Sequence, residues 1–303
     1  MHVGFLSNQL DNRGTGNALY NYAHYNEEIL GNKSSIYTFA RGRHDAAAYV
    51  NFENRFGRVS DVTEGFAKLD ALYHIKSGVK DGFSPGLPYL VHSVFDNEPH
   101  GTIYATISPW MGERYNLPFV PHIVEIFQTD DDLRNELGIP VTSMVFGRYG
   151  GLDSFDIPFV WDAINELLES RTDVYFLFMN TAAPSKIFDV KRVIFLQATV
   201  DPREKRRFIN SSNAFLHARG RGETFGLAVA EFAVAGKPII TYAHSNERAH
   251  LQELGQQAYL YADKDSLKAV LNSLINKPTV SWGYQQYTPE NVMQKFEQVF
   301  LTK

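Results

Sequence analysis

The sequence of 303 residues contains no cysteine and no long apolar run. Without cysteine it can form neither a disulfide nor a thiolate metal site, a composition that fits a reducing compartment. No stretch approaches the ~18 apolar residues of a membrane span. The chain begins Met-His-Val-Gly-Phe-Leu, which lacks the basic region and long apolar core of a signal peptide. We therefore expect a cytoplasmic protein without a membrane span.

A strong charge of either sign is also missing. The formal net charge is −5, and the 29 lysines and arginines are spread along the chain. Proteins that bind nucleic acid normally carry a basic patch, so we expect no nucleic-acid partner. Apolar residues make up 44% of the chain, which is enough for two hydrophobic cores in domains of about 150 residues each.

Short apolar runs alternate with amphipathic segments along the chain. Residues 3–7, 33–39 and 88–94 are typical of buried strands, and residues 158–170 and 289–301 are typical of helices. This alternation favours a doubly wound parallel sheet with helices on both faces. The predicted fold class is therefore α/β, with two Rossmann-like doubly wound domains.

Residues 213–238 combine the features of a phosphate site. An apolar run stops at a glycine-rich turn, and residues from about 225 favour a helix. Backbone N–H groups at such a turn and the helix N-terminus attract an anion. Glu223 lies in the turn, and Glu231 lies about 8 Å further along the helix, at about 1.5 Å per residue. A diphosphate there would leave Glu231 beside a ribose; the alternative is that both glutamates are solvated.

The amino-acid sequence of this stretch resembles the C-domain signature of family 4 glycosyltransferases, which are retaining enzymes of the two-lobed GT-B fold. The signature is matched in order by Glu223, Phe225, Gly226, Leu227, Glu231, Ala233, Gly236 and Pro238. The resemblance implies that Glu231 holds the ribose hydroxyls of a nucleotide-sugar. It also implies that Glu223 contacts the hexose and its phosphate. The backbone N–H groups that follow Glu223 would share this role, and they belong to Thr224, Phe225, Gly226 and Leu227.

The same family has a Gly-Arg pair after a strand, then a lysine about six residues later, and the two cations hold the diphosphate. Arg148 fits this pattern, but position 154 is Ser154. GT-B enzymes generally work without a metal, so the resemblance implies no cofactor and no metal site. The missing charge would come from Arg219, Arg221 or Arg13. The alternative for Arg148 is a surface salt bridge.

Three glycine-loop residues and one histidine are candidates in the first half. Gly14, Thr15 and Gly16 follow the first strand, where open α/β sheets bind ligands; the alternative is a tight turn. His92 lies in a strand where members of the resembled family often carry a histidine that faces the transferred sugar. This makes His92 a second catalytic candidate beside Glu223, and the alternative is a hydrogen-bonded core histidine.

The resemblance also divides the chain. Val-Pro-His at 120–122 is similar to the segment with which family members cross between lobes. We assign residues 1–125 to an acceptor domain and 126–285 to a donor domain across a cleft, with a last helix at 286–303 that crosses back to the first domain. Residues 129–138 are predicted as a helix, since aspartates favour a first turn. The basic residues of the helix at 202–210 are interpreted as its solvated face.

The implied activity is retaining transfer of a hexose from a nucleoside-diphosphate sugar to a glycan or protein-linked sugar. GDP-mannose is the expected donor, ahead of UDP-sugars. Since no carboxylate nucleophile is established in the resembled family, Glu223 is assigned to sugar orientation and electrostatics. The start of the first helix is similar to that of short family 4 enzymes from large algal DNA viruses (chlorovirus-like), which suggests the host cytoplasm.

Two other functions stay open. A sugar-nucleotide epimerase could share the fold, and a catalytically impaired sugar-nucleotide-binding scaffold would explain Ser154 in place of the lysine. The acceptor, the linkage and the oligomeric state are also open, and a homodimer is one of the states considered.

Overall fold

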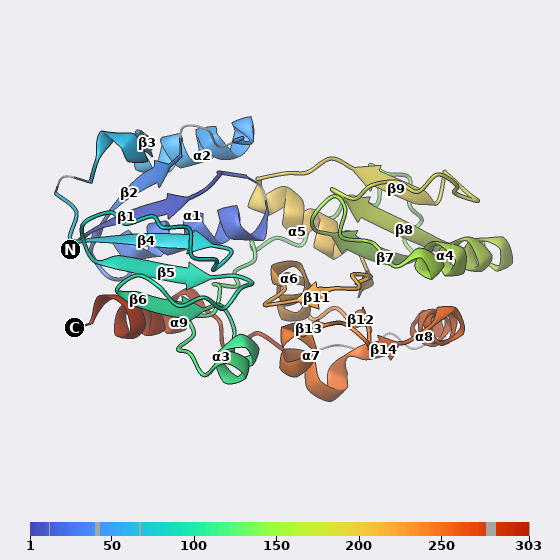
Figure 1. Cartoon of the computed structure of the whole chain (residues 1–303). Helices are drawn as coiled ribbons and strands as arrows, with labels where there is room; N and C mark the ends of the chain where they lie inside the picture. The colour runs from blue at the N-terminus through green and yellow to red at the C-terminus, as the bar shows by residue number, and fades with distance from the viewer. Residues whose placement is uncertain (12, 40–42, 67, 277–282, 303) are drawn as a thin grey trace. The chain divides into compact units, whose positions relative to one another are not determined.

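The computed structural model describes residues 1–11, 13–39, 43–66, 68–276 and 283–302. The chain divides into two compact units (Figure 1): unit 1 comprises Met1–Ile123 and Gln286–Lys303, and unit 2 comprises Val124–Gln285. Each unit is built on its own six-stranded parallel sheet. The predicted α/β class with two doubly wound domains is confirmed.

Unit 1 begins with a buried strand, as its apolar run predicts. Its strands include β1 (His2–Ser7), β2 (Lys33–Thr38), β3 (Ser60–Asp61), β4 (Ala71–Lys76), β5 (Tyr89–Ser93) and β6 (Ile103–Thr106). They lie in the order β3-β2-β1-β4-β5-β6, which reverses between β1 and β4. Its helices include α1 (Gly14–Glu28), α2 (Ala46–Phe56), α3 (Pro109–Tyr115) and α9 (Pro289–Phe296), which continues as a π-helical turn over Glu297–Leu301.

The last helix belongs to the core of unit 1. Phe296 of α9 is fully buried, with its ring centroid 6.3 Å from that of Phe5 in β1 and 5.3 Å from that of Tyr22 in α1. Phe300 packs against Tyr73 of β4 at 5.5 Å between centroids. Burying one such side chain contributes about 1.5–3 kcal/mol, so the last residues are part of what stabilises unit 1.

Unit 2 repeats the same strand order. Its sheet reads β14-β12-β10-β7-β8-β9 and reverses between β7 and β10. These strands are β7 (Met144–Tyr149), β8 (Val174–Met179), β9 (Val193–Leu196), β10 (Ala214–Leu216), β12 (Ile239–Tyr242) and β14 (Tyr259–Tyr261); a small separate sheet pairs β11 (Gly222–Glu223) with β13 (Glu247–Arg248). The helices include α4 (Pro158–Ser170), α5 (Pro202–Ser211), α6 (Leu227–Val234), α7 (Ala249–Leu254) and α8 (Lys264–Asn276). Within the described ranges, no helix of either unit is long and apolar enough to cross a bilayer.

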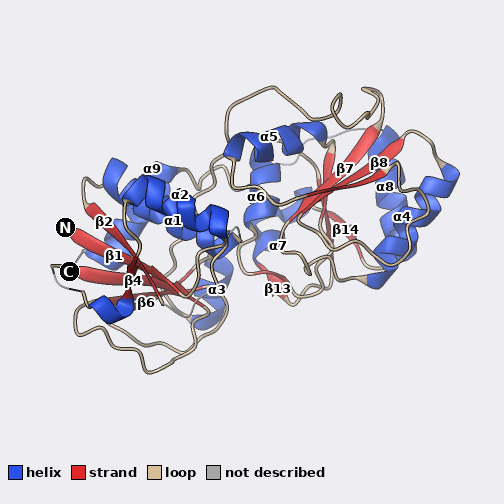
Figure 2. Cartoon of the chain, turned by 90° about the horizontal axis from the view of Figure 1, so that it is seen from above, coloured by secondary structure: helices blue, strands red, loops and turns tan. Residues whose placement is uncertain are grey.

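The two faces of the unit 2 sheet are covered by different helices (Figure 2). α4 and α8 pack on one face, in a cluster that includes Phe146 of β7. α5 and α6 pack on the other, where Phe208 and Phe232 contact the ring of Tyr149. Because successive side chains of a strand point to opposite faces, Arg148 points to the α4 face and Tyr149 to the α5–α6 face.

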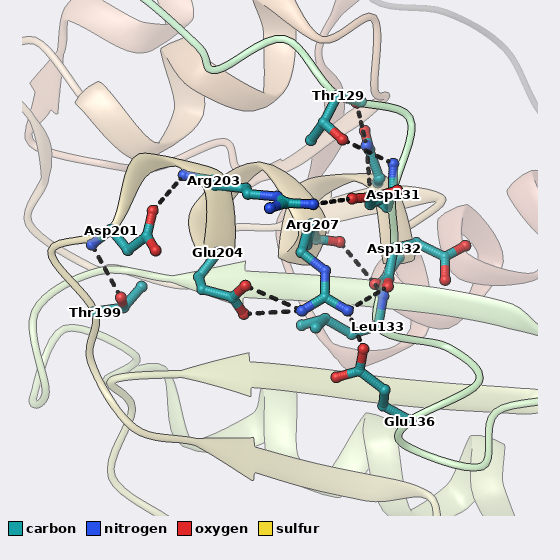
Figure 3. Close-up of polar contacts among 12 residues, drawn as sticks. Thr129, Asp131, Asp132, Leu133, Glu136, Thr199, Asp201, Arg203, Glu204 and Arg207 are labelled. Atoms are coloured by element: carbon teal, nitrogen blue, oxygen red, sulfur yellow. Dashed lines mark hydrogen bonds and ion pairs between the residues drawn. The ribbon is translucent and has the colours of Figure 1, made fainter.

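The helix predicted for residues 129–138 is wrong, because turns occupy this segment. Figure 3 shows side chains of α5 holding it in place. Arg203 Nη2 donates to Asp131 Oδ2 at 2.7 Å, and Arg207 pairs with Glu136. Two side chains of the segment accept from backbone N–H groups two residues on, and such local bonds compete with a helix. Arg203 and Arg207 of α5 are therefore paired with this segment, although the Arg203 side chain is still 57% exposed.

Candidate functional site

Polar side chains gather at one edge of the unit 2 sheet. The carboxyl ends of β7 and β10 are neighbours at the reversal of the strand order, which is where open α/β sheets bind ligands. Arg148 lies near the end of β7, and His217 follows β10 directly. Thr181 follows β8, and Thr241 lies near the end of β12. All four residues are buried.

The loop from β10 to α6 is shaped by close backbone contacts. Gly222 has a φ of 79°, and a Cβ there would lie 2.1 Å from the Glu247 carbonyl oxygen. Gly226 has a φ of 90° directly before α6, and its Cβ would lie 3.1 Å from the Glu223 side chain. Only glycine fits both positions without strain, so these glycines fix where Glu223 lies.

Glu223 is an ionised carboxylate held at both oxygens. His217 Nε2 donates to Oε1 at 3.2 Å, and Arg219 Nη1 donates to Oε2 at 2.9 Å. Burial by itself raises the pKa, but the hydrogen bond from His217 and the charge of Arg219 outweigh it and lower the pKa of Glu223 to about 2. A group with this pKa is not a general acid at neutral pH; it can orient a ligand and stabilise positive charge.

Arg148 is a buried cation, 3% exposed, whose hydrogen bonds go to uncharged oxygens. Nη2 donates to Ser154 Oγ at 2.6 Å and to Gly151 O at 3.0 Å, while Nη1 donates to Asn180 O at 3.3 Å and to Thr181 Oγ1. Burial lowers the pKa of Arg148 to about 10. The structure places no carboxylate of the described residues in a salt bridge with it, so a bound anion would offset the cost of burying this charge.

Ser154 supports Arg148 where the resemblance expects a second cation. Its Oγ accepts from the guanidinium and donates to Gly151 O at 2.9 Å. Of the residues considered as sources of the missing charge, Arg219 is already bound to Glu223. Arg221 Nη2 lies 3.8 Å from Glu247 Oε1, with its side chain 48% exposed.

Glu231 pairs with a lysine of α5. Lys205 Nζ lies 3.0 Å from Glu231 Oε1, and the two side chains are 21% and 12% exposed. Burial raises the pKa of Glu231 to about 8 and lowers the pKa of Lys205 to about 8. Each charge offsets the burial cost of the other. Glu231 is therefore not the solvated helix carboxylate that the sequence allowed.

The remaining predicted donor-site residues flank Glu223. Thr224 and Phe225 are buried, and Phe225 O accepts from Tyr284 Oη at 2.8 Å. Leu227 begins α6. Unit 2 thus brings the predicted residues of its loop together with Arg148, whose charge interacts with both Glu223 and Arg219. Over the described part of the chain, no three acidic or histidine side chains form a group suited to a metal ion.

His92, the second catalytic candidate, is a core residue of unit 1. Its side chain is fully buried; Nδ1 lies 2.7 Å from Tyr73 Oη, and Nε2 lies 3.1 Å and 2.9 Å from the carbonyl oxygens of Thr106 and Val120. Burial lowers the pKa of His92 to about 4, so the ring is neutral. Since both ring nitrogens are engaged, the arrangement corrects the expectation that His92 faces a sugar.

Gly14, Thr15 and Gly16 form the first turn of α1. A Cβ on Gly16 would lie 2.0 Å from the Asp11 carbonyl oxygen. Close packing therefore accounts for Gly16 without a ligand, and a ligand contact by Thr15 stays a prediction.

Sequence reasoning missed Lys205 and two residues behind Glu223. Lys205 lies three and four residues before the buried Phe208 and Ile209, a helical spacing that could have placed it on the inner face of α5. Thr241 Oγ1 lies 2.9 Å from His217 Nδ1 and 3.0 Å from His250 Nε2. These three come from separate segments, and no local pattern joins them.

Comparison with protein-family models matches residues 185–291 to the family described as glycosyl transferases group 1. The matched range is about a third of the chain and contains Glu223 and Glu231. The comparison with curated proteins gives no match.

Several solved structures share the fold of nearly the whole chain. HepE of Anabaena, in complex with UDP and glucose, has a TM-score of 0.70 at 15% identity, over 99% of this chain and 95% of that chain. A glycosyltransferase from Rickettsia africae has a TM-score of 0.64 at 10% identity, over 97% and 94%. WaaG, a glycosyltransferase involved in lipopolysaccharide biosynthesis, has a TM-score of 0.62 at 12% identity, over 99% and 96%. The fold of this chain is GT-B.

Proposed function

We propose that this protein is a retaining glycosyltransferase of family 4 that moves a hexose from a nucleoside-diphosphate sugar to a glycan or protein-linked sugar. The match to glycosyl transferases group 1 supports sugar transfer. HepE, which shares the fold, has been solved in complex with UDP-glucose. The observation that carries the proposal is the buried Arg148, bonded to uncharged oxygens near the ionised Glu223, because such a cation suits a diphosphate.

The proposed reaction breaks the bond between the sugar C1 and the diphosphate oxygen and forms one between C1 and the acceptor oxygen. Negative charge grows on the leaving diphosphate, where Arg148 and the N–H groups at the start of α6 stabilise it. One well-placed donor contributes roughly 3 kcal/mol to such a step. The departing phosphate oxygen accepts the proton of the acceptor hydroxyl, so Glu223 transfers no proton.

In this proposal Glu223 orients the hexose and stabilises the positive charge that develops on it, since its carboxylate is ionised. Glu231 accepts hydrogen bonds from the ribose hydroxyls. Lys205, 3.0 Å from Glu231 Oε1, lowers the cost of ionising this buried carboxyl, whose pKa burial raises to about 8.

We propose GDP-mannose as the first donor to test and UDP-glucose as its main competitor. Neither a metal nor a cofactor is required in the proposed reaction, because Arg148 and the loop supply the positive charge. We place the activity in the cytoplasm, that of the host if the chain is of viral origin, and include a homodimer as a proposed assembly.

Calorimetric titration with a panel of GDP- and UDP-sugars, first without metal and then with magnesium, tests the proposal. Micromolar binding of one donor without metal is the expected result. Absence of binding to every nucleoside-diphosphate sugar would contradict it, and binding only with magnesium would contradict its metal-independent part.

A sugar-nucleotide-binding scaffold is the second candidate, and Ser154 favours it because a second buried cation is missing beside Arg148. A scaffold binds the donor but forms no product with any acceptor. The variant Ser154→Lys separates the two functions: turnover that appears only in the variant supports the scaffold, and turnover in the wild type rejects it.

A further inference from the structure

Unit 2 carries a hollow of about 700 Å³ between α4 and the segment that joins β8 to β9. This volume lies within the range of about 300–1,000 Å³ that is typical of small-molecule sites. The lining includes Asn165 and Glu169 of α4, and Ser185, Lys186, Phe188 and Val190 of the joining segment. None of the candidate donor-site residues that the structure describes belongs to this lining. The hollow is therefore a second concave region of unit 2, separate from the candidate donor site.

The walls of the hollow are held in place by the protein itself. The Phe188 N–H donates to Asn165 Oδ1 at 2.9 Å, which fixes the joining segment to α4. Further along, Arg192 Nη2 donates to Leu168 O at 2.7 Å. Between these two contacts and β8, Ile187 packs against the apolar core that α4 covers. The hollow is thus formed before any ligand arrives, which lowers the entropic cost of binding.

Two large apolar side chains of the hollow are exposed. Phe188 is 55% exposed and Val190 is 73% exposed, even though the backbone of Phe188 is bonded to α4. The ring therefore stays in solvent on an anchored segment. The face of an aromatic ring carries partial negative charge and attracts C–H groups, so Phe188 offers an apolar surface against which a ligand can pack.

The polar side chains around this ring lack protein partners. Because the Phe188 N–H can only donate, Asn165 meets it with Oδ1 and keeps its Nδ2 amide group for another partner. Among the residues that the structure describes, neither this amide group nor the side chains of Glu169, Ser185 and Lys186 form a hydrogen bond or salt bridge. The hollow thus presents donors and acceptors together, and its one cation and one carboxylate balance.

We propose that this hollow is a second saccharide site, which binds a neutral oligosaccharide with one sugar ring packed on Phe188 and its hydroxyls bonded to Asn165, Glu169 and Lys186. A sugar ring carries C–H groups on its face and hydroxyls at its edge. This combination matches an apolar ring surrounded by unpaired donors and acceptors. A phosphate or an acidic sugar would need an excess of positive charge, which the balanced charges of Glu169 and Lys186 do not supply.

This inference rests on the proposed function for the role of the ligand, since the saccharide held here would be part of a glycan acceptor. Holding one part of a glycan chain raises the effective concentration of the rest of that chain at the protein. The site takes no part in breaking or forming the glycosidic bond. It should therefore influence KM for long acceptors and leave kcat unchanged.

The first test is a 1H–15N NMR titration of the full-length protein without donor. The probes are neutral hexasaccharides of glucose, mannose and N-acetylglucosamine, with a galacturonic acid hexasaccharide as the acidic counterpart. At least one neutral probe should bind with a Kd of about 1 mM and shift the resonances of Asn165, Lys186 and Phe188. Unchanged resonances at these residues with every neutral probe at about 10 mM would overturn the proposal. Tighter binding of the acidic probe would contradict its neutral character.

Variants of the exposed ring show whether the saccharide packs on it. Phe188→Ala should weaken binding about tenfold, whereas Phe188→Tyr keeps the ring and should bind as the wild type does. Val141→Ala removes another exposed apolar side chain of unit 2, 87% exposed and outside the hollow, and should also bind normally. Equal affinities of Phe188→Ala and the wild type would reject the packing on Phe188. If Phe188→Ala does not fold, Glu169→Gln and Lys186→Met decide, and both should weaken binding.

Sedimentation distinguishes a saccharide site from an interface between copies. Wild type and Phe188→Ala should show the same oligomeric state, because the proposal reserves this surface for a ligand. If Phe188→Ala converted a dimer into a monomer, a second copy of the chain would cover the hollow, and the saccharide site would be rejected.

Kinetics separate this inference from the proposed function. With a working donor, Phe188→Ala should raise KM about tenfold for a hexasaccharide acceptor and leave KM for a monosaccharide acceptor, KM for the donor and kcat unchanged. If the hexasaccharide binds at Phe188 and no sugar is transferred to any acceptor, the saccharide site stands and the proposed function fails. If sugar is transferred, and Phe188→Ala matches the wild type in both KM values and in the titration, only the saccharide site fails.

Discussion

Units 1 and 2 share one strand order, yet each carries a different buried cation at the end of a strand beside its reversal point. In unit 1, Lys76 of β4 is 4% exposed and its Nζ lies 2.5 Å from Asp81 Oδ2. In unit 2, Arg148 of β7 is 3% exposed and is bonded to uncharged oxygens. The first cation is neutralised by a carboxylate of the protein, whereas the second forms no salt bridge with any residue that the structure describes. The same architecture therefore does not make the same site.

The histidines of the two units differ in the same way. In unit 1, His92 and His74 each lie 2.7 Å from a tyrosine hydroxyl, and both are buried and neutral. In unit 2, His217 connects an ionised carboxylate to the interior.

The largest effect is expected from Arg148→Ala. The variant should lose about 100-fold in affinity for a nucleoside diphosphate, since hydrogen bonds to charged groups contribute about 1.5–3 kcal/mol each, and should keep its affinity for the nucleoside. Lys76→Ala, which removes the paired cation of unit 1, is the control and should bind both as the wild type does. Calorimetric titration measures the four affinities; equal losses for nucleoside and nucleoside diphosphate would remove Arg148 from the phosphate site.

Glu223→Gln should make the free energy of unfolding depend less on pH in the acid range. The folded pKa is about 2, below the ordinary value of about 4.3, so the carboxylate stabilises the fold above about pH 4.3 and this stability is lost as the pH falls toward 2. Up to about 3 kcal/mol is involved. Between about pH 5 and 3 the free energy of unfolding should fall by about 2 kcal/mol more in the wild type than in the variant. Parallel pH curves would show that Glu223 is not stabilised by its partners.

His92→Leu should affect stability without affecting the donor. The change removes the hydrogen bonds of His92 to the Tyr73 hydroxyl and the Val120 carbonyl oxygen, at a cost of about 2 kcal/mol, whereas Thr106 O still accepts from the Val120 N–H. Denaturant unfolding measures this loss, and titration should give an unchanged donor affinity. A variant of normal stability with reduced turnover would restore His92 as a catalytic residue.

Lys205→Met should shift the pH dependence of donor binding, with a smaller effect. With the lysine in place, burial raises the pKa of Glu231 to about 8, and loss of the neighbouring ammonium raises it further, so the carboxyl of the variant stays protonated to a higher pH and accepts hydrogen bonds from the ribose hydroxyls poorly. Donor affinity should be weaker than that of the wild type at about pH 9, by up to about tenfold, and should approach it at about pH 6, where both carboxyls are protonated. Lys205→Arg keeps the charge and is the control. A loss that is the same at both values of pH would argue for a packing effect.

The alternation of strands and helices was predictable because it follows from local apolar spacing. The segment 158–170 forms α4 as predicted. The helix at 129–138 was wrong because its turns depend on α5, 72 residues away in the contact between Arg203 and Asp131. The local sequence pattern carries no information about a partner at that separation in the chain.

The same distinction between local features and contacts of distant residues applies to the candidate site. The turn around Glu223 was visible because its glycines and the start of α6 are contiguous in sequence. The pairing of Lys205 with Glu231 spans 26 residues, and the contact from Thr241 to His217 spans 24. These contacts exist only once the sheet has brought the strand ends together, so sequence could predict the residues of the contiguous loop but not those that support them.

The position of α9 in the core of unit 1 also sets an order for folding during synthesis. Unit 1 consists of two chain segments, and the residues of unit 2 come between these segments in the sequence. The ribosome therefore completes all of unit 2 before it makes Phe296 and Phe300, which pack on β1 and β4. Domains fold as units once their residues have emerged. The nascent chain thus passes through a stage in which the half with the candidate site is complete while the first half still lacks part of its apolar core.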